Sequence, residues 1–367
     1  MRILYGVVGE GMGHATRSRV ILEHLFTCGH EVEVVTSGRA VEFLQRHFGA
    51  RGLVHRIHGM HIVYADNRVR RGSTLFDNVL AGAAALPKQV AAYLELVAGF
   101  RAQLVISDFE SWSYYYGKLH GLPILSIDNM QLLNRCSLDS DVLSGQHLEF
   151  ELTKALVKGK LPHSTHYLIT TFFGLPVRKK RTTLFPPILR PEILEAQASR
   201  GDHLLVYQTA EGYDSLPEIL HRTGLECRIY GLRRGLQQEV VEGKLRFRPF
   251  DEARFIEDLA SAQGVIAGGG FTLMSEAVYL KKPMLAVPVR GQIEQIVNAR
   301  YLARLGYGRY AAALDQAATV HDFIAGIPEH AQRLASYQQD GNQELFRFLD
   351  AQLAALTEKP RAWAASR

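Results

Sequence analysis

Cysteine is scarce in this sequence, and its three cysteines are far apart. Cys28, Cys136 and Cys227 form no Cys-x-x-Cys pair and no cysteine–histidine cluster in the sequence. Disulfide-dense folds and structural zinc sites depend on such clusters. The sequence therefore argues against both and favours a reduced, cytoplasmic setting.

Long apolar runs are also lacking. No stretch approaches the roughly 20 apolar residues that a membrane-spanning helix needs, and the apolar run from Met1 to Val8 meets Gly9 too early for a signal peptide. The net charge of +5 permits attraction to anionic lipid or to nucleic acid without choosing between them. We expect a cytoplasmic protein, with peripheral contact at the inner face of the cell membrane as the membrane-related option.

What the sequence does have is a regular alternation of strand and helix patterns, which is typical of parallel sheets covered by helices. The length of 367 residues exceeds one ordinary core and suits two domains. Clustered prolines without helical or strand periodicity indicate a linker between them. We predict strands at 3–8, 31–35, 103–107, 123–127 and 167–170 before this linker, and at 203–207, 227–230, 245–248, 264–267 and 284–287 after it.

These elements predict an α/β fold of two Rossmann-like, doubly wound domains that face an interdomain cleft. We expect an N-terminal domain over 1–175, a linker over 176–200 and a C-terminal domain over 201–340. Helical spacing runs from Pro328 to Leu356, and residues 341–367 are expected to form a helix that packs back on the N-terminal domain. Ligands bind at the carboxyl ends of the strands in such sheets, so the cleft should hold the chemistry.

A glycine turn follows the predicted strand at 264–267. Gly268, Gly269 and Gly270 precede a helix that carries Thr272 and, one turn further, Glu276. A glycine loop at a helix N-terminus offers free backbone N–H groups and the positive end of the helix dipole, which together hold phosphate. The carboxylate can accept hydrogen bonds from a ribose diol. The segment predicts a nucleotide site, and the alternative for Glu276 is an acid in the first turn of a surface helix.

Polar side chains are dense at the next turn from strand to helix. Gln292, Glu294, Gln295 and Asn298 lie near the start of the helix that follows Val289. Amides and a carboxylate in this position suit several sugar hydroxyls, and the alternative is a solvated polar face. Together with the glycine turn, they point to a sugar nucleotide.

A second glycine loop, formed by Gly9, Gly11 and Gly13, follows the first predicted strand and leads to His14. The dinucleotide-binding fingerprint is incomplete here, because its third glycine is missing and no acidic residue ends the second strand. An imidazole at this edge of the sheet is placed to take a proton from an acceptor hydroxyl. The alternative is a histidine that caps the helix or packs against the linker.

Asp108 follows the buried strand predicted at 103–107 and so lies at the same edge of the sheet. A carboxylate bonded to one imidazole nitrogen would orient His14 and stabilise its protonated form. Alternatively, Asp108 caps the helix that starts near Glu110. The two roles are compatible.

These motifs together resemble a known family. The segment from Gly268 to Asn298, with its glycine turn, Thr272, Glu276 and the Lys282-Pro283 pair, resembles the donor-binding signature of the UDP-glycosyltransferase superfamily. That superfamily has the GT-B fold and includes the N-acetylglucosaminyltransferase that makes lipid II. The glycine loop with His14 and a following arginine, and the Ser-Asp-Phe sequence at 107–109, extend the likeness to the N-terminal half. The sequences at 187–190 and 126–129 resemble a branch of predicted prokaryotic glycosyltransferases.

The resemblance implies a role for each matching residue. The glycine turn with Thr272 would bind the diphosphate, and Glu276 would hold the ribose hydroxyls. Glu294 and Gln295 would contact the donor sugar, with His14 as general base and Asp108 as its partner. Phe250 is the residue assigned to the nucleobase loop. The donor-binding residues expected on this basis are Gly268, Gly269, Gly270, Phe271, Thr272, Glu276, Phe250, Gln292, Glu294 and Gln295.

The sequence departs from the superfamily at three places. Phe271 replaces a small residue, which would narrow the phosphate path or shield the donor. Glu294 stands where many members have aspartate, which leaves the identity of the donor sugar open. The first strand of the C-terminal domain ends in Gln208-Thr209 instead of a glycine–serine pair, which leaves that phosphate contact open.

The expected reaction is transfer of a hexose or N-acetylhexosamine from a nucleoside diphosphate sugar, with UDP as the expected nucleotide, to a hydroxyl. We expect inverting, metal-independent chemistry, with the UDP-sugar as co-substrate and no other cofactor. Asp139-Ser140-Asp141 lacks a phosphate-binding context, so it is expected to form a turn or a helix cap rather than a metal site.

The acceptor is less defined by the sequence. The segment 61–90 places Arg68, Arg70 and Arg71 before apolar residues, a pattern that would dock on anionic lipid or grip a lipid-linked acceptor; the alternative is a loop and helix packed on the first domain. We expect no nucleic-acid partner. Two other functions stay open: a UDP-sugar 2-epimerase or hydrolase of the same fold, and a non-catalytic nucleotide-sugar-binding subunit.

Overall fold

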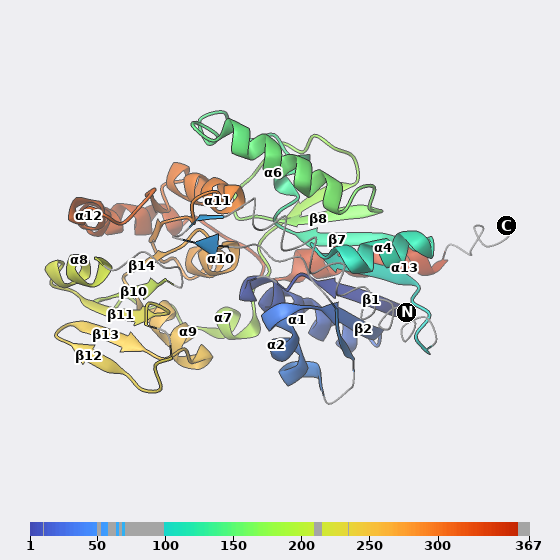
Figure 1. Ribbon diagram of the computed structural model, residues 1–367, viewed down its shortest axis with the longest axis horizontal. Coiled ribbons are helices and arrows are strands. Elements are labelled where there is room, and N and C mark those ends of the chain that lie inside the picture. The colour runs from blue at the N-terminus through green and yellow to red at the C-terminus, as the bar shows by residue number, and fades with distance from the viewer. Residues whose placement is uncertain are drawn as a thin grey trace.

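The computed structural model describes residues 1–9, 11–49, 53–57, 64–65, 68–69, 99–208, 215–233 and 235–358. Within these residues the chain forms two seven-stranded sheets and a two-stranded hairpin of β4 (Tyr64–Ala65) and β5 (Arg68–Val69). Each large sheet is accompanied by its own helices, and the two units lie side by side (Figure 1). The predicted α/β class with two parallel-sheet, Rossmann-like domains is confirmed.

The first sheet has the order β3-β2-β1-β6-β7-β8-β9, and all of its neighbouring strands are parallel. Its central strands are almost fully buried because helices cover both faces, which explains their near-continuous apolar sequence. The strands are β1 (Arg2–Val7), β2 (Glu31–Thr36), β3 (Val54–Arg56), β6 (Leu104–Asp108), β7 (Ile124–Asp128), β8 (His166–Thr170) and β9 (Thr182–Phe185). The helices of this half are α1 (Met12–Thr27), α2 (Gly38–Phe48), α4 (Ser111–Leu119), α5 (Leu132–Arg135) and α6 (His147–Lys160).

The second sheet has the order β12-β13-β11-β10-β14-β15-β16 and is parallel except for the edge pair β12–β13. Its strands are β10 (His203–Tyr207), β11 (Glu226–Tyr230), β12 (Val240–Glu242), β13 (Leu245–Arg248), β14 (Gly264–Ala267), β15 (Met284–Ala286) and β16 (Gly308–Tyr310). Its helices are α8 (Leu216–Arg222), α9 (Glu252–Ser261), α10 (Phe271–Tyr279), α11 (Ile293–Arg304) and α12 (Ala317–Leu334).

The segment between the two sheets is more ordered than its sequence suggests. Residues 182–185, which show no strand pattern, form β9 and extend the first sheet beside β8. A short helix, α7 (Pro191–Glu195), follows, with proline at its first position where the missing N–H costs nothing. Strand pairing from the first domain therefore reaches into the range expected to be a linker.

The last helix, α13 (Gln343–Glu358), returns to the first domain. Its residues Leu345, Leu349 and Leu353 belong to the buried cluster around β1 and α1, and Figure 1 shows this red helix beside the blue N-terminal strands. The helical pattern from Pro328 to Leu356 is interrupted in the structure, because α12 ends at Leu334 and α13 begins at Gln343.

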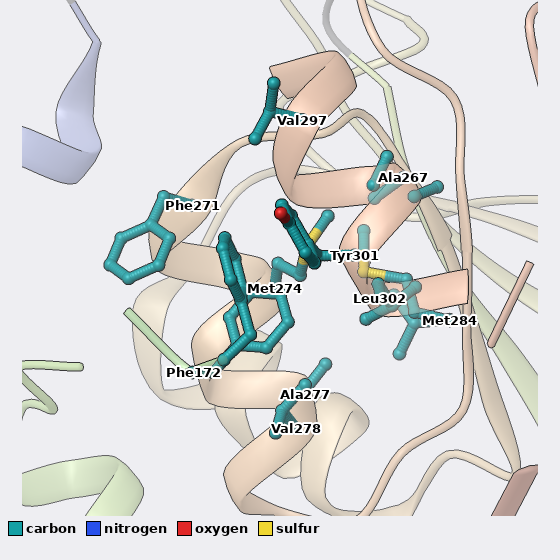
Figure 2. Close-up of a cluster of buried hydrophobic side chains, with 14 of the residues drawn as sticks. Phe172, Ala267, Phe271, Met274, Ala277, Val278, Met284, Val297, Tyr301 and Leu302 are labelled. Carbon is teal, nitrogen blue, oxygen red and sulfur yellow. The ribbon is translucent and has the colours of Figure 1, made fainter. Parts of the chain in front are cut away.

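Apolar packing joins the two domains. One buried cluster includes residues from α5, α6 and β8 together with residues from α10 and α11. Phe173 stacks on Tyr301 with ring centroids 4.2 Å apart, and Phe172 faces Phe271 at 6.1 Å. Figure 2 shows Phe172 seated against Phe271 and Met274 of α10. This seam fixes the strand ends of one sheet relative to those of the other.

Shortening a buried side chain of α13 should destabilise the first domain, although this helix lies at the far end of the sequence. Leu349 is 0% exposed, so we expect Leu349→Ala to lower the free energy of unfolding by about 2–5 kcal/mol through lost burial and a residual cavity. Leu148→Ala, at a side chain that is 70% exposed, is the control. Equal unfolding midpoints of the two variants in urea would contradict the packing of α13.

Candidate functional site

Three neighbouring strands of the first sheet end at one place. β1 leads to His14 on α1, β6 ends at Asp108, and β7 ends at Asp128. Val7 and Asp108 are paired in register, so the first turn of α1 rises directly beside Asp108. Parallel strands deliver their carboxyl ends to a common edge, and this edge faces the C-terminal domain.

His14 and Asp108 are brought together as predicted. The Asp108 carboxylate is 1% exposed, and its Oδ1 lies 2.7 Å from His14 Nδ1. Arg17 holds the same carboxylate, because its Nε donates to Oδ2 at 2.7 Å and one of its terminal nitrogens donates to Oδ1. Ser18 Oγ donates to Oδ2 at 3.0 Å. The carboxylate is therefore ionised, fixed and fully partnered.

This arrangement sets the protonation of the imidazole. An Arg17 terminal nitrogen and Asp108 Oδ1 both lie close to His14 Nδ1, at 2.5 and 2.7 Å. Because the ionised carboxylate needs a donor, we assign the imidazole proton to Nδ1, which leaves Nε2 with its lone pair. Burial and the Arg17 charge lower the pKa of His14, against the opposing effect of Asp108. Burial alone would raise the pKa of Asp108, but Arg17 and His14 lower it to about 2. A neutral imidazole beside an ionised carboxylate is the form that a general base requires.

The helix after β6 is capped by a neighbour of Asp108. The Glu110 carboxylate accepts from the backbone N–H groups of Trp112 and Ser113 at 2.6 Å each. The alternative role of Asp108 as the cap of this helix is therefore wrong, because its oxygens are engaged by α1. Lys160, at the end of α6, lies 4.1 Å from the Phe109 ring centroid and brings a positive charge to the same edge.

The glycine turns of the two domains meet across the interface. Gly11 is the N-cap of α1 with φ of 79°, a conformation that favours glycine. A side chain at Gly13 would clash with Thr272, since a Cβ there would lie 2.5 Å from Thr272 Oγ1. The N-terminal ends of α1 and α10 therefore lie close together, and both present the positive ends of their dipoles to the same region.

The glycine turn before α10 has two distinct parts. Gly269 packs against α11, where a Cβ would lie 2.6 Å from the Gln295 carbonyl oxygen. Gly270 is exposed, is the N-cap of α10 and receives no side-chain capping bond. Gly268 is partly exposed and lies near the Gln295 side chain. Gly9 is likewise closely packed, because a Cβ at this position would clash with Ser37.

Phe271 is 6% exposed, because its ring belongs to the apolar seam with Phe172. Figure 2 shows the ring at the edge of the cluster, pointing away from Val297 and Tyr301 of α11. Its large side chain is thus accounted for by contact between the domains. Thr272, the next residue, carries the hydroxyl that faces α1.

Glu276 is 2% exposed and paired with an arginine that the sequence did not single out as a partner. Arg190 Nε donates to Glu276 Oε1 at 2.8 Å, and Arg190 Nη2 donates to Oε2 at 2.9 Å. The third nitrogen of the guanidinium donates to Glu252 at 2.5 Å. The alternative of an acid on a surface helix is wrong for Glu276, since it is buried.

The polar start of α11 connects to the first domain. Asn298 Nδ2 donates to Glu294 Oε1 at 2.7 Å and to Asn129 Oδ1 at 3.2 Å, across the interface. Burial raises the pKa of Glu294 to about 7, and burial raises the pKa of Asp128 to about 6. Asp128 also adds to the rise in the pKa of Glu294, so two carboxyl groups that protonate near neutrality lie at the domain interface.

The remaining predicted donor residues have separate positions. Gln295 Oε1 accepts from the Val289 backbone N–H at 3.0 Å and so supports the turn before α11. Gln292 is the N-cap of α11. Phe250 is 63% exposed and borders an aromatic group formed with Tyr207, Tyr230 and Phe255. It follows β13, at the carboxyl end of that strand.

The Asp139-Ser140-Asp141 sequence lies at the domain interface. Tyr301 donates to Asp139 at 3.0 Å, and Arg304 donates to Asp141 at 2.5 Å. Among the described residues, one group with metal-ligand chemistry comes together: His24, Cys28 and Asp350, with ligand atoms within 4.8 Å of one another. That group joins α1 to α13 at the opposite end of α1 from His14. It is separate from the candidate active site.

Several residues of the site were missed or underused by the sequence analysis. Arg17 lies on the same face of α1 as His14, and this three-residue spacing was the available signal. Asp128 directly follows a predicted buried strand, as Asp108 does. No local signal identifies Arg190 as the partner of Glu276, because the two are far apart in sequence. Residues 70 and 71 and most of the segment 61–90 lie outside the described residues, as does Thr209.

Comparison with known proteins places these features in a family context. The profile of the family described as "Glycosyl transferase family 1" matches residues 1–328. A protein of Methanosarcina mazei named "Uncharacterized glycosyltransferase" is 25% identical over 335 residues, covering 84% of this chain and 85% of that protein. A Bacillus cereus protein, UDP-N-acetylglucosamine–N-acetylmuramyl-(pentapeptide) pyrophosphoryl-undecaprenol N-acetylglucosamine transferase 3, is 26% identical over 220 residues, covering 52% of this chain and 61% of that protein.

Solved structures share the fold. Phytolacca americana UGT2, solved with UDP-2fluoro-glucose and pterostilbene, superposes with a TM-score of 0.67 at 13% identity, covering 97% of this chain and 100% of that chain. The glycotransferase of kitacinnamycin gives a TM-score of 0.66 at 14% identity, covering 96% and 98%. The expected GT-B architecture is confirmed.

Removal of the Asp108 charge should lower the pKa of His14 further. Asp108 is the group that raises this pKa, whereas Arg17 lowers it. We expect Asp108→Asn to move the titration of His14, followed by NMR of its Cε1 proton, to lower pH, and Arg17→Gln to move it to higher pH. Asp350→Asn, which removes the carboxylate beside His24, is the control. A rise in the Asp108→Asn variant would contradict the assigned pairing.

Proposed function

The chain belongs to glycosyl transferase family 1, and on this premise we propose that it transfers a hexose or N-acetylhexosamine from UDP to a hydroxyl acceptor. The observation that carries this proposal is the contact between Gly13 and Thr272. Because of this contact, the His14–Asp108 pair of one domain lies near the N-terminus of α10 in the other, and helix N-termini of this kind bind phosphate. The protein is thus an enzyme of the glycosyltransferase class.

His14 serves as the general base. The acceptor hydroxyl gives its proton to Nε2 while its oxygen attacks the anomeric carbon, and the bond from that carbon to the diphosphate oxygen breaks. Asp108 stabilises the imidazolium that forms, and Arg17 and Ser18 keep the carboxylate in place. A single displacement of this kind inverts the anomeric configuration.

The negative charge that develops on the diphosphate is stabilised by the start of α10. The exposed N-cap Gly270 leaves backbone N–H groups free for phosphate, and the Thr272 hydroxyl lies beside them. The neighbouring N-terminus of α1 adds a second positive dipole end. These groups support a metal-independent departure of UDP.

Glu294 and Gln295 are proposed to recognise the donor sugar, with Glu276 on the ribose and Phe250 at the nucleobase. The pKa of about 7 for Glu294 lets it donate as well as accept a hydrogen bond near neutral pH. The hydrogen bond from Asn298 fixes its orientation. This geometry suits a sugar hydroxyl or an N-acetyl group.

Replacement of His14 separates catalysis from donor binding. We expect His14→Ala to reduce transfer, measured as UDP release in an acceptor screen, by about 10²- to 10⁴-fold, while UDP still raises the unfolding temperature. His120→Ala, at the C-cap residue that follows α4, is a matched histidine control.

Unchanged transfer in the His14→Ala variant would remove His14 from the mechanism. UDP release together with an epimerised or hydrolysed sugar, in the absence of an acceptor product, would favour the epimerase or hydrolase instead. Loss of activity in EDTA would contradict metal independence.

We propose further that the protein contacts an anionic membrane and acts on a lipid-linked acceptor. Among the described residues no helix has both the length and the apolarity to cross a bilayer, so the contact would be peripheral. Support comes from α6, where Leu148, Leu152 and Leu156 recur every four residues and are 70%, 47% and 75% exposed. Figure 1 shows α6 along the outer edge of the first domain.

Basic residues flank this leucine row, and one of them, Lys154, pairs with Glu151 of the same helix at 2.9 Å. The pKa of Lys179 is lowered, first by burial and by the charge of Arg135. Lys158 and Lys154 of α6 also contribute to this lowering, so they lie near Lys179. Lys179 belongs to the basic run Arg178–Arg181, and Val177, which precedes that run, is exposed. Apolar side chains with a basic border are typical of helices that lie in an anionic membrane interface.

Binding to vesicles tests this surface. We expect the wild-type protein to co-sediment with phosphatidylglycerol-containing vesicles and much less with pure phosphatidylcholine. The variant Leu148→Ser/Leu152→Ser/Leu156→Ser should bind at least about tenfold more weakly, because it removes the apolar insertion. Val241→Ser, at an exposed valine of the second domain, is the control. Equal binding of all three proteins would contradict the proposal.

A further inference from the structure

Arg190 occupies an unusual position between the two domains. It immediately precedes α7, in the chain segment that connects the first sheet to the second. Its side chain is 8% exposed and reaches into the second domain, where it forms a bidentate pair with Glu276 of α10 and a further bond to Glu252 of α9. One arginine from the connecting segment thus holds a carboxylate of the proposed donor site.

The backbone around Arg190 is anchored to other elements. Asn342, in the segment before α13, bonds both the N–H and the carbonyl of Leu189, at 2.9 and 2.7 Å. Glu192 accepts from Arg19 of α1 at 2.6 Å. The two chain segments that cross between the domains therefore meet beside Arg190, and the first domain helps to fix them.

The geometry of the pair leaves Glu276 able to accept further bonds. Arg190 approaches through Nε and Nη2, one bond to each carboxylate oxygen, which is the side-on fork of a guanidinium. Each ionised carboxylate oxygen has a second lone pair. Burial raises the pKa of Glu276, and the charge and hydrogen bonds of Arg190 counteract part of that rise. Without the arginine, a carboxyl group this deeply buried would lose its charge and its fixed rotamer.

We infer that Arg190 is a positioning residue of the donor site, which holds Glu276 so that its two oxygens accept hydrogen bonds from the ribose hydroxyls of UDP. The inference rests on the proposed function, in which Glu276 binds the ribose. It adds that recognition of the ribose depends on the crossing segment between the domains and so on their relative placement. Arg190 itself touches neither the sugar nor the reacting atoms.

A purely structural ion pair would behave differently from a positioning pair. Loss of a structural pair weakens binding of every nucleotide to the same extent, through stability or domain placement. Loss of a positioning pair removes the advantage conferred by the ribose hydroxyls and leaves binding of a nucleotide without them unchanged. A comparison of UDP with 2′,3′-dideoxy-UDP distinguishes these cases.

The experiment measures the dissociation constants of both nucleotides by calorimetry on the full chain. We expect the wild-type protein to bind UDP about 10- to 100-fold more tightly than 2′,3′-dideoxy-UDP, as is usual for hydrogen bonds to a charged group. In Arg190→Gln this ratio should fall to within about threefold of unity, as it should in Glu276→Gln. The affinity for the dideoxy compound should stay within about threefold of the wild-type value.

Two further variants make the result decisive. Arg333→Gln breaks an exposed arginine–glutamate pair on α12 and should leave the ratio unchanged. Arg190→Lys retains the charge but loses the fork, so it should fold and show an intermediate ratio; it carries the test when the glutamine variant does not fold.

The possible failures are distinguishable. A wild-type ratio that persists in the Arg190 variants, with equal loss of affinity for both nucleotides, would overturn the positioning role and leave the proposed function intact. Absence of UDP binding by the wild-type protein would overturn the proposed donor site, and the inference about Arg190 with it.

Discussion

The apolar seam between the domains is the contact on which the site depends. His14 and Thr272 are far apart in the sequence and belong to different sheets, so no local interaction can bring them together. The stacking of Phe173 on Tyr301 and the burial of Phe172 and Phe271 do so. Hydrophobic burial is non-directional. The hydrogen bond from Asn298 to Asn129 is directional, so it helps to set the relative orientation of the two domains.

Both domains contain a buried carboxylate whose charge is balanced by an arginine. Each contributes one buried carboxylate that is held by the fork of an arginine, Asp108 in the first domain and Glu276 in the second. A buried carboxylate without such a partner would become neutral or reorient. Arg17 comes from within the same domain, whereas Arg190 comes from the connecting segment, so the second carboxylate is the one tied to domain placement.

Most of the fold and half of the site could be predicted from the sequence. Buried parallel strands read as apolar runs, which located β10, β13 and β14 at their exact residues. Because parallel strands end at the same edge of a sheet, the sequence predicted that His14 and Asp108 lie close together. The pairing of Arg190 with Glu276 depends on long-range packing that leaves no local pattern. β9 was missed for a related reason, because an edge strand with a half-buried, threonine-rich sequence resembles a loop.

The return of α13 to the first domain has a consequence for synthesis. The leucines of this helix complete the core that begins with β1, so the first domain leaves the ribosome with an open apolar face and stays so until residue 358 has emerged. The second domain is synthesised entirely within that interval. The core of the first domain can therefore be completed only after the second domain has been synthesised.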